Sequence, residues 1–393
     1  MPYATGRIYN DADAHVMEPV NWLASYADAK TRELLKPMDL SNAGKMNEHA
    51  TASTGKFPAS HWDEVDIEKN LMFIKGWGAL GAFDPAERKR ALDLMGFNRQ
   101  LVFTSLAMGQ FWGVFAQREY NQDLLYGGAA AVNRAISDFC KDDQRLIPVG
   151  FLPLDDAGRA ERTIDEGLKL GCGTFWIPAN PAGDKSPTHH AFDGVWGRLQ
   201  DANVPFMLHV GAGETPMPSA YRNNDRGPIT GFLGAGEDLD SKAFMMLHGP
   251  AEAFLSAMVL DGTLEQFPRL RGGVIELGAL WVPPWLRRLD VAQQAFARTE
   301  PGLALPLKAS DYVRRQLKFT PHPTEPVGWI IEQGGAELFL FSSDYPHVEG
   351  GRNPLKRFEE SMVGVAEAAK ERFYSANFNE LMGRSAVEPD RAR

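Results

Sequence analysis

Eight short apolar runs recur along the chain, and a helical pattern of apolar and polar positions follows most of them. Several runs are apolar at nearly every position, such as LFLFSS at 338–343, which is typical of strands buried on both faces of a parallel sheet. The run at 316–320 is the weakest of the eight. The expected strands cover residues 7–16, 99–105, 145–154, 173–179, 204–211, 272–278, 316–320 and 338–343.

Between these runs the sequence predicts helices. The first begins after Asp84, which can cap it, and Pro85 suits its first turn. Strands that alternate with helices indicate βαβ units, and eight such units favour a closed barrel. We therefore expect an α/β fold with a single, distorted (β/α)8 TIM-type barrel over residues 1–393. The other expected helices cover 118–141, 155–171, 191–202, 251–266, 326–333 and 368–382.

Two long insertions interrupt this alternation. Residues 37–82 lie between the first two expected strands, and residues 212–247 follow the fifth. Both leave the C-terminal ends of strands, which is the face of such barrels where active sites lie. Loops of this length in a compact domain are usually functional, so we expect lids or oligomer contacts. The polar tail at 384–393 is expected to be loose.

The composition agrees with one large globular domain and narrows the choice of partners. Of 393 residues, 44% are hydrophobic and 23% are charged. The formal net charge of −10 argues against nucleic acid or an anionic membrane as the main partner. The sequence shows neither a signal peptide nor a run of about 18 apolar residues. We therefore expect a cytoplasmic protein that acts on a small molecule.

Acidic and imidazole side chains gather where the expected strands end. Asp13 and His15 are two residues apart on the first strand, so they share one face, together with Asp11. In a closed barrel the strand ends form a ring, so these groups are expected to converge. Buried carboxylates are costly unless they are paired or bound to a cation. The remaining members, on the fifth, sixth and eighth strands and just beyond, are His209, Glu276, Asp344 and His347.

A divalent metal suits this set of side chains. Imidazole and carboxylate ligands together fit zinc, manganese or iron. Taken singly, His209 is better explained as a core histidine, Asp344 could be a turn residue, and Asp13 with His15 could be a surface turn or a capping pair. Their joint placement at three strand ends favours a metal site. The ion would lower the pKa of a bound water or polarise a substrate oxygen.

Five motifs are spread over nearly the whole chain: DADAHVMEP at 11–19, LHVG at 208–211, GTLEQFPRLR at 262–271, ELGALWVP at 276–283 and SDYPHVEGG at 343–351. With these motifs the sequence resembles the amidohydrolase superfamily, and more narrowly the branch that contains aminocarboxymuconate-semialdehyde decarboxylase and the aromatic-acid decarboxylases. The resemblance implies one divalent ion held by Asp13, His15, His209 and Asp344, with Asp344 also carrying a proton. It is specific for the branch and not for a substrate.

Two departures from the family pattern leave alternatives open. The first-strand motif is D-x-H rather than H-x-H, and Glu276 stands where the semialdehyde decarboxylase has a catalytic histidine. Glu276 could be a general base or a ligand to a second metal. His347 could likewise be a further ligand or a partner that orients one. His248 could donate a proton in the pocket or cap the helix that follows it.

Substrate contacts are harder to identify from the sequence. Aromatic residues occur in segments at the expected catalytic end, although most are expected in the core. Three arginines lie in loops at that end, and one of them could bind a substrate carboxylate through two hydrogen bonds. We take Trp176, Trp281 and Arg352 as the candidate substrate-binding residues. The others are Trp77, Phe111, Trp112, Arg222 and Arg226.

The leading interpretation is a metal-dependent hydrolase or carboxy-lyase. It would hydrolyse or non-oxidatively decarboxylate a small aromatic carboxylic acid, with Asp344, Glu276 and His248 as catalytic groups. One alternative is an oxygen-dependent hydroxylase with a dinuclear iron or manganese centre on the same fold. Another is a non-catalytic subunit that accompanies an active homologue. We expect a homo-oligomer, either a dimer or a tetramer.

Overall fold

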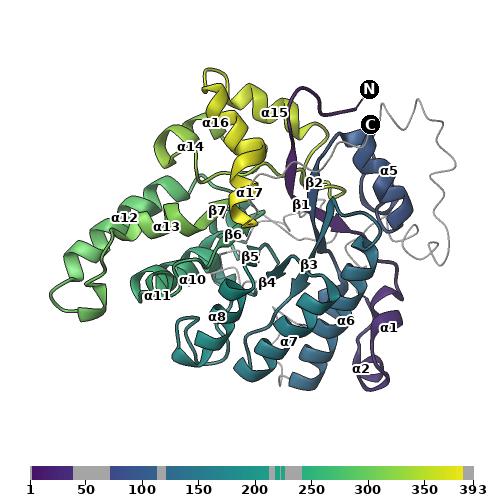
Figure 1. Ribbon diagram of the computed structural model, residues 1–393, viewed down its shortest axis with the longest axis horizontal. Helices are drawn as coiled ribbons and strands as arrows, with labels where there is room; N and C mark the ends of the chain where they lie inside the picture. The colour runs from purple at the N-terminus through teal and green to yellow at the C-terminus, as the bar shows by residue number, and fades with distance from the viewer. Residues whose placement is uncertain are drawn as a thin grey trace.

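Seven parallel strands form one sheet, and their order in space follows their order in the sequence. Figure 1 shows the strands in the middle of the molecule with the helices around them. The strands are β1 (Asn10–Val16), β2 (Arg99–Thr104), β3 (Leu146–Phe151), β4 (Thr174–Trp176), β5 (Phe206–His209), β6 (Gly272–Ile275) and β7 (Leu317–Phe319). This computed structural model describes residues 2–38, 71–112, 121–211, 217–221, 223–225 and 241–383.

Helices connect the strands on the outside, as the alternating pattern predicts. Asp84 caps α5 as expected, because its Oδ1 accepts hydrogen bonds from the backbone N–H groups of Ala86 (2.8 Å) and Glu87 (3.2 Å). The helices are α1 (Trp22–Tyr26), α2 (Ala29–Leu34), α5 (Pro85–Met95), α6 (Gln122–Cys140), α7 (Ala157–Leu170), α8 (Asp193–Asp201), α9 (Ser241–Met246), α10 (Gly249–Leu260), α11 (Thr263–Gln266), α12 (Val282–Phe296), α13 (Ala309–Gln316), α14 (Val327–Gly334), α15 (Pro354–Ser361), α16 (Glu367–Glu371) and α17 (Asn377–Leu381).

The eighth apolar run, 338–343, is not a regular strand, so the expected count of eight is not confirmed. It nevertheless hydrogen-bonds to both edges of the sheet. The N–H of Leu340 donates to the carbonyl of Phe319 on β7 (2.9 Å), and the N–H of Ala12 on β1 donates to the carbonyl of Phe341 (3.0 Å). The segment therefore lies between β7 and β1, as a TIM-like barrel requires.

Side-chain hydrogen bonding explains why this segment is irregular. The N–H of Ser343 donates to Oδ1 of Asp11 at 2.7 Å rather than to a backbone carbonyl. The next residue, Asp344, has a φ of 50°, which is outside the β region. The ladder to β1 is thus interrupted at the point where the segment carries a candidate site residue.

Several helices differ from the sequence expectation. The pattern predicts no helix between the sixth and seventh runs, yet α12 and α13 lie there, and α12 buries Trp285, Leu286 and Leu289 on one face. The helix expected over 251–266 is divided into α10 and α11 at Gly262, whose φ is 80°. Most of the two expected insertions and the whole of the tail at 384–393 lie outside the described residues.

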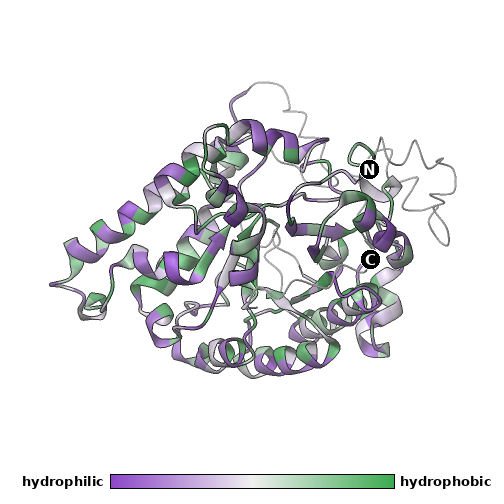
Figure 2. Cartoon of the chain, turned by 45° about the horizontal axis from the view of Figure 1, so that its top comes forward, coloured by the Kyte–Doolittle hydropathy of each residue, from purple (hydrophilic) through white to green (hydrophobic). Residues whose placement is uncertain are grey.

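The outer helices have one face on the core. Figure 2 shows hydrophilic and hydrophobic positions side by side on the long helices, with α12 as a clear case. One stretch, 241–260, is long and apolar enough to cross a membrane by length and composition alone. It comprises α9 and α10, and Phe254, Leu255 and Met258 of α10 are buried inside the protein. Packing in the core accounts for the apolar character of α10.

Candidate metal centre

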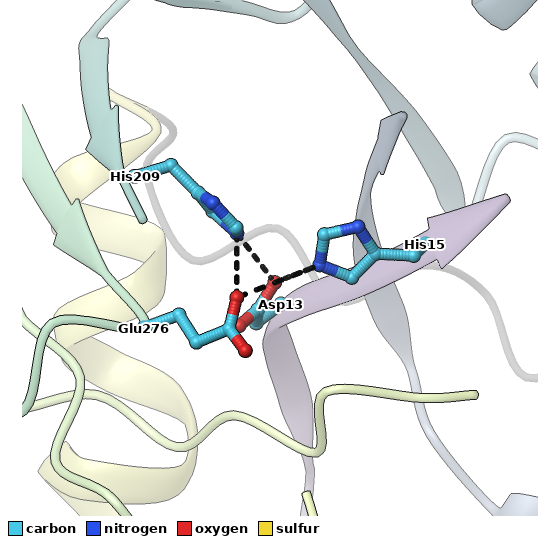
Figure 3. A group of neighbouring side chains, drawn as sticks. All are labelled: Asp13, His15, His209 and Glu276. Carbon is cyan, nitrogen blue, oxygen red and sulfur yellow. Dashed lines mark hydrogen bonds and ion pairs between the residues drawn. The ribbon is translucent and has the colours of Figure 1, made fainter. Parts of the chain in front are cut away.

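The candidate ligands come from strand ends on one side of the sheet. β1 carries Asp13 and His15, β5 ends on His209, and Glu276 follows β6 directly. Figure 3 shows these four side chains pointing toward one another. Asp13 and His15 are each 1% exposed and His209 is 3% exposed. The structure therefore brings these four groups together in a space that is nearly closed to solvent. Asp13 and Glu276, the two that are furthest apart in the sequence, are separated by 263 residues.

The spacing of their polar atoms is that of a coordination shell. Oδ1 of Asp13 lies 3.1 Å from Nε2 of His15 and 3.3 Å from Nε2 of His209. Oε2 of Glu276 lies 3.3 Å from Nε2 of His209 and 4.0 Å from Nε2 of His15. A cation with bonds of about 2.1 Å holds neighbouring ligands about 3.0–3.4 Å apart. Most of these separations match that spacing.

A second group of possible ligands overlaps the first. Oδ1 of Asp344 lies 3.6 Å from Nε2 of His15 and 3.1 Å from Nδ1 of His347. The His347 ring stacks on the His15 ring at a centroid distance of 3.8 Å. His15, Glu276, Asp344 and His347 each offer a ligand atom, and these four atoms lie within 4.8 Å of one another. His15 and Glu276 are common to both groups.

The hydrogen bonds of the two buried imidazoles fix which nitrogen faces the cluster. Nδ1 of His15 lies 3.0 Å from the carbonyl oxygen of Thr104, and Nδ1 of His209 lies 3.0 Å from that of Val210. A carbonyl only accepts, so each Nδ1 carries the proton and donates it. A neutral ring then presents the lone pair of Nε2 to the cluster, as metal-binding histidines do.

Burial keeps His15 neutral. Loss of hydration, helped by the nearby His347, lowers the pKa of His15 to about 4. Burial alone would raise the pKa of Asp13, and only positive charge at the facing nitrogens of His209 and His15 outweighs burial and lowers that pKa. A neutral imidazole lone pair therefore faces a carboxylate oxygen at 3.1 Å. Two such electron-rich atoms repel each other unless a cation lies between them.

Several atoms of the cluster also lack hydrogen bonds. Among the described residues, Oδ2 of Asp13, Nε2 of His15 and both carboxylate oxygens of Asp344 are buried without a hydrogen-bond partner. Unsatisfied buried polar groups are rare and cost about 1–3 kcal/mol each. A divalent cation would satisfy these atoms together, so the residues fit a metal ion.

Two of the carboxylates are held in an unfavourable backbone conformation. Glu276 has a φ of 56° and Asp344 a φ of 50°, in the left-handed region that residues other than glycine avoid. The N–H of Glu276 donates to Oγ1 of Thr320 (2.9 Å), and the N–H of Asp344 donates to the carbonyl of Asp13 (2.9 Å). Conformations of this kind cost roughly 1–3 kcal/mol and concentrate at functional sites.

The SDYPHVEGG motif includes a glycine whose lack of a side chain the site requires. A Cβ atom at Gly350 would overlap the carbonyl oxygen of Ser343 and lie 3.0 Å from Cβ of Asp344. We expect Gly350→Ala to displace Asp344 and to weaken Mn²⁺ binding by about 10-fold or more, as changes beside metal ligands do. Gly302→Ala is the matched control, since its Cβ would meet no atom within 4 Å. Equal Mn²⁺ affinities of the two variants in a titration would contradict this expectation.

Two of the other predicted site residues have contacts elsewhere. Nε2 of His248 lies 3.4 Å from Oε2 of Glu252, and its ring stacks on Trp281 at 5.2 Å. The exposed Arg352 lies over the ring of Phe73 at 5.9 Å. In the described part of the chain, no contact joins His248 or Arg352 to the cluster. Arg222 and Arg226 lie outside the described residues.

Aromatic rings form a wall against the two histidines. The ring centroid of Trp176 lies 4.8 Å from that of His209, and Phe103 lies 4.4 Å from His209 and 5.7 Å from His15. Nε1 of Trp176 is buried and donates no hydrogen bond to any described residue. Trp176 thus combines an apolar surface with an unused donor next to the candidate ligands.

Lys75 is a buried cation within electrostatic range of the cluster that the sequence analysis did not single out. Its ammonium is buried without a hydrogen-bond partner among the described residues, 5.9 Å from the ring centre of Tyr345. Burial lowers its pKa to about 8, while the carboxylates of Asp344 and Glu349 favour the charged form. Lys75 therefore places a positive charge beside the cluster at neutral pH. The only signal in the sequence is a single lysine inside the apolar stretch FIKGW at 73–77.

Comparison with a library of family profiles gives one match. The profile described as amidohydrolase covers residues 11–378. A search of curated proteins found no match.

Solved structures share the fold at low identity. An amidohydrolase from Mycobacterium avium subsp. paratuberculosis K-10 has a TM-score of 0.72 and 18% identity, and the match covers 98% of this chain and 100% of that one. The 5-carboxyvanillate decarboxylase of Novosphingobium aromaticivorans, complexed with manganese and 4-hydroxy-3-methoxy-5-nitrobenzoic acid, has a TM-score of 0.63 and 16% identity, and the match covers 97% of this chain and 98% of that one. A dihydroxybenzoic acid decarboxylase of Polaromonas sp. JS666, with manganese and 2-nitroresorcinol bound, has a TM-score of 0.61 and 17% identity, and the match covers 96% of this chain and 97% of that one.

Proposed function

This chain belongs to the amidohydrolase family, and from that premise we propose that it is a metal-dependent carboxy-lyase that removes CO2 from a small aromatic carboxylic acid. The observation that carries the proposal is the buried cluster of imidazole and carboxylate groups with ligand-like spacing. Asp13, His15, His209 and Asp344 would hold one divalent ion, with Glu276 within reach. When bound, the ion would withdraw negative charge from a substrate oxygen.

Lys75 supports a carboxylate as the substrate group. The Lys75 ammonium has no hydrogen-bond partner among the described residues, which is costly for a buried cation, so the site favours a ligand that brings a negative charge. A substrate carboxylate beside Lys75 would form a charge-assisted hydrogen bond with the ammonium. This role replaces the one that the sequence suggested for Arg352, which is exposed and lies over Phe73.

The wall of Trp176 and Phe103 supports an aromatic substrate. Flat apolar surfaces accept an aromatic ring by stacking or edge contact. The unused N–H of Trp176 is available to a hydroxyl or carboxylate oxygen of that substrate. Two solved relatives, the 5-carboxyvanillate and dihydroxybenzoic acid decarboxylases, bind nitrated phenols in the same fold.

The proton required by the reaction would come from Asp344. Non-oxidative decarboxylation breaks the bond between the ring carbon and the carboxylate, and CO2 leaves while the electron pair stays on that carbon. Asp344 would take up a proton from solvent as the substrate binds, donate it to the ring carbon, and return to the carboxylate that faces the metal. Among the described residues its carboxylate has no hydrogen-bond partner that would compete with this transfer. Glu276, which follows β6, would hold or orient the substrate.

A second candidate function rests on the second ligand group. Because His15, Glu276, Asp344 and His347 also converge within 4.8 Å, the site has enough ligands for two ions. Two ions of iron or manganese would suit an oxygen-dependent hydroxylase. Hydrolysis, which needs only one ion, is the alternative within the same family.

One experiment separates these functions. The Mn²⁺-loaded protein is incubated without oxygen with a panel of hydroxybenzoic acids and their esters and amides in H2¹⁸O, and CO2 and products are measured by mass spectrometry. We expect CO2 release and a product that lacks ¹⁸O. Incorporation of ¹⁸O would indicate hydrolysis instead, and turnover only when O2 is admitted would indicate the hydroxylase. A fully metal-loaded protein without turnover would favour the non-catalytic subunit.

A further inference from the structure

Three fully buried polar side chains form a chain beside the candidate metal centre. Arg88 comes from α5, Gln100 from β2 and Asp11 from β1, and each is 0% exposed. The sequence places Asp11 on the same face as the ligands, but its carboxylate is absent from both ligand groups of the described residues. The three residues need another explanation, because buried polar groups are expensive to maintain.

Asp11 ties together the two backbone segments that carry Asp13 and Asp344. Its Oδ1 accepts from the N–H of Ser343 (2.7 Å) and from the N–H of Asp13 (3.3 Å). Its Oδ2 accepts from Oγ of Ser343 (2.6 Å) and from Nε2 of Gln100 (2.7 Å). Ser343 immediately precedes Asp344. The Asp11 carboxylate thus makes four hydrogen bonds, and three of them reach a candidate ligand or its neighbour.

Arg88 contacts the same two segments from the other side. Its Nη2 donates to the backbone carbonyl of His15, and its Nε donates to the carbonyl of Gly81 (2.7 Å). Its guanidinium carbon lies 5.2 Å from the ring centre of Tyr345, the residue after Asp344. Arg88 therefore touches the main chain of one candidate ligand and the side chain that follows another.

Gln100 can hydrogen-bond to both Arg88 and Asp11 in only one orientation of its amide group. Its Oε1 accepts from Nη1 of Arg88 (2.9 Å), and its Nε2 donates to Asp11 (2.7 Å). A reversed amide would place donor against donor and acceptor against acceptor. The orientation of Gln100 is therefore fixed, and a fully satisfied network of this kind leaves its members little freedom.

We propose that Arg88, Gln100 and Asp11 form a positioning network that sets the distance between the β1 ligands and Asp344, and thereby the affinity of the site for its metal. The inference rests on the proposed function, because it assigns these residues to the same metal centre. None of them touches the ion or the substrate. Partners that orient metal ligands typically change metal affinity about 10- to 100-fold when they are removed.

The test compares two buried glutamines, one in the network beside the cluster and one away from it. Gln100→Leu removes both amide hydrogen bonds of the network. Gln316→Leu removes three hydrogen bonds just before β7 begins and away from the cluster. Its Nε2 donates to the carbonyls of Phe267 and Leu270, and its Oε1 accepts from Nε of Arg315 (all 2.9 Å). Both variants are expected to unfold at lower temperature than the wild type. Only Gln100→Leu is expected to raise the Kd for Mn²⁺, by about 10- to 100-fold.

Mn²⁺ binding to the full-length, metal-stripped protein is followed by the electron paramagnetic resonance signal of the free ion. Ser343→Ala removes the Oγ donor to Asp11 and the Oγ acceptor of the Tyr345 N–H (3.2 Å). It is a milder variant should Gln100→Leu fail to fold, and it should raise the Kd several-fold. Wild-type Kd values in Gln100→Leu or Ser343→Ala would overturn the inference, and so would equal Kd increases in Gln100→Leu and Gln316→Leu. A wild-type protein that binds no Mn²⁺ would instead overturn the proposed function.

Discussion

Asp344→Asn is expected to lower kcat for CO2 release by about 10²- to 10⁴-fold, the contribution of a well-placed acid or base. An amide cannot donate the proton that the ring carbon needs, and it removes a negative charge from the metal centre. The substitution is suited to this test because Asn tolerates the left-handed backbone that the φ of 50° at this position requires. The melting temperature of the Asn variant should therefore stay near that of the wild type.

Asp344→Ala serves as the comparison, because alanine lacks this tolerance and should lose stability as well as activity. Single-turnover and steady-state rates, together with thermal unfolding, separate the two effects. An Asn variant that retains more than a tenth of wild-type kcat would show that the proton has another source. Glu276 and His347 would then be the next candidates.

Lys75→Met is expected to have opposite effects on function and stability. Loss of the charged partner should raise KM for the carboxylate substrate about 10- to 100-fold, because hydrogen bonds to charged groups contribute about 1.5–3 kcal/mol. The same change removes a buried cation that has no hydrogen-bond partner in the described part of the chain, so the substrate-free variant should be more stable than the wild type. Such a trade between stability and activity is typical of binding sites.

Lys318 provides the matched control for Lys75. It is also buried, but its ammonium donates to Oε2 of Glu380 (2.9 Å) and to the carbonyl of Glu337 (2.6 Å). Lys318→Met should therefore destabilise the protein, because it leaves those acceptors unpaired, without the KM increase of Lys75→Met. A Lys75→Met variant with unchanged KM, or with lower stability than the wild type, would refute the assigned role of this lysine.

The pH dependence of stability gives a second test of Lys75. Its pKa is lowered to about 8 in the folded protein, below the 10.5 of an ordinary lysine. Between these two pH values the unfolded chain binds more protons at this residue than the folded protein does. This residue's contribution to the free energy of unfolding should therefore rise with pH across that window. Across this window, chemical denaturation should show a larger rise in stability for the wild type than for Lys75→Met, and the difference is the contribution of Lys75.

Strands and strand-end residues were predictable because the local pattern determines both. An apolar run such as 99–105 is typical of a strand that is buried on both faces in the centre of a parallel sheet, and it forms β2 (Arg99–Thr104). In a barrel the ends of all strands meet on one face, so residues such as His209 and Glu276 could be placed without knowledge of their neighbours. The irregular eighth segment could not be foreseen, since it depends on Asp11 capturing the N–H of Ser343.

Buried charges were not predictable for a related reason. Lys75 and Arg88 occur in segments whose lysines and arginines would normally be exposed to solvent. Their burial depends on Tyr345, which lies about 260 residues away in sequence and packs near both charged groups. α12 and α13 were missed because they separate the sixth and seventh runs without a recognisable cap, as the lack of a side-chain cap hydrogen bond in both helices shows.

Metal analysis of the purified protein tests the metal centre most directly. After incubation with Mn²⁺ and removal of excess ion, the wild type should retain one equivalent per chain by inductively coupled plasma mass spectrometry. Asp13→Ala and His209→Ala should retain much less, and removal of the ion with a chelator should abolish CO2 release until Mn²⁺ is restored. A metal-free protein with full activity would contradict the metal centre assigned to Asp13, His15, His209 and Asp344.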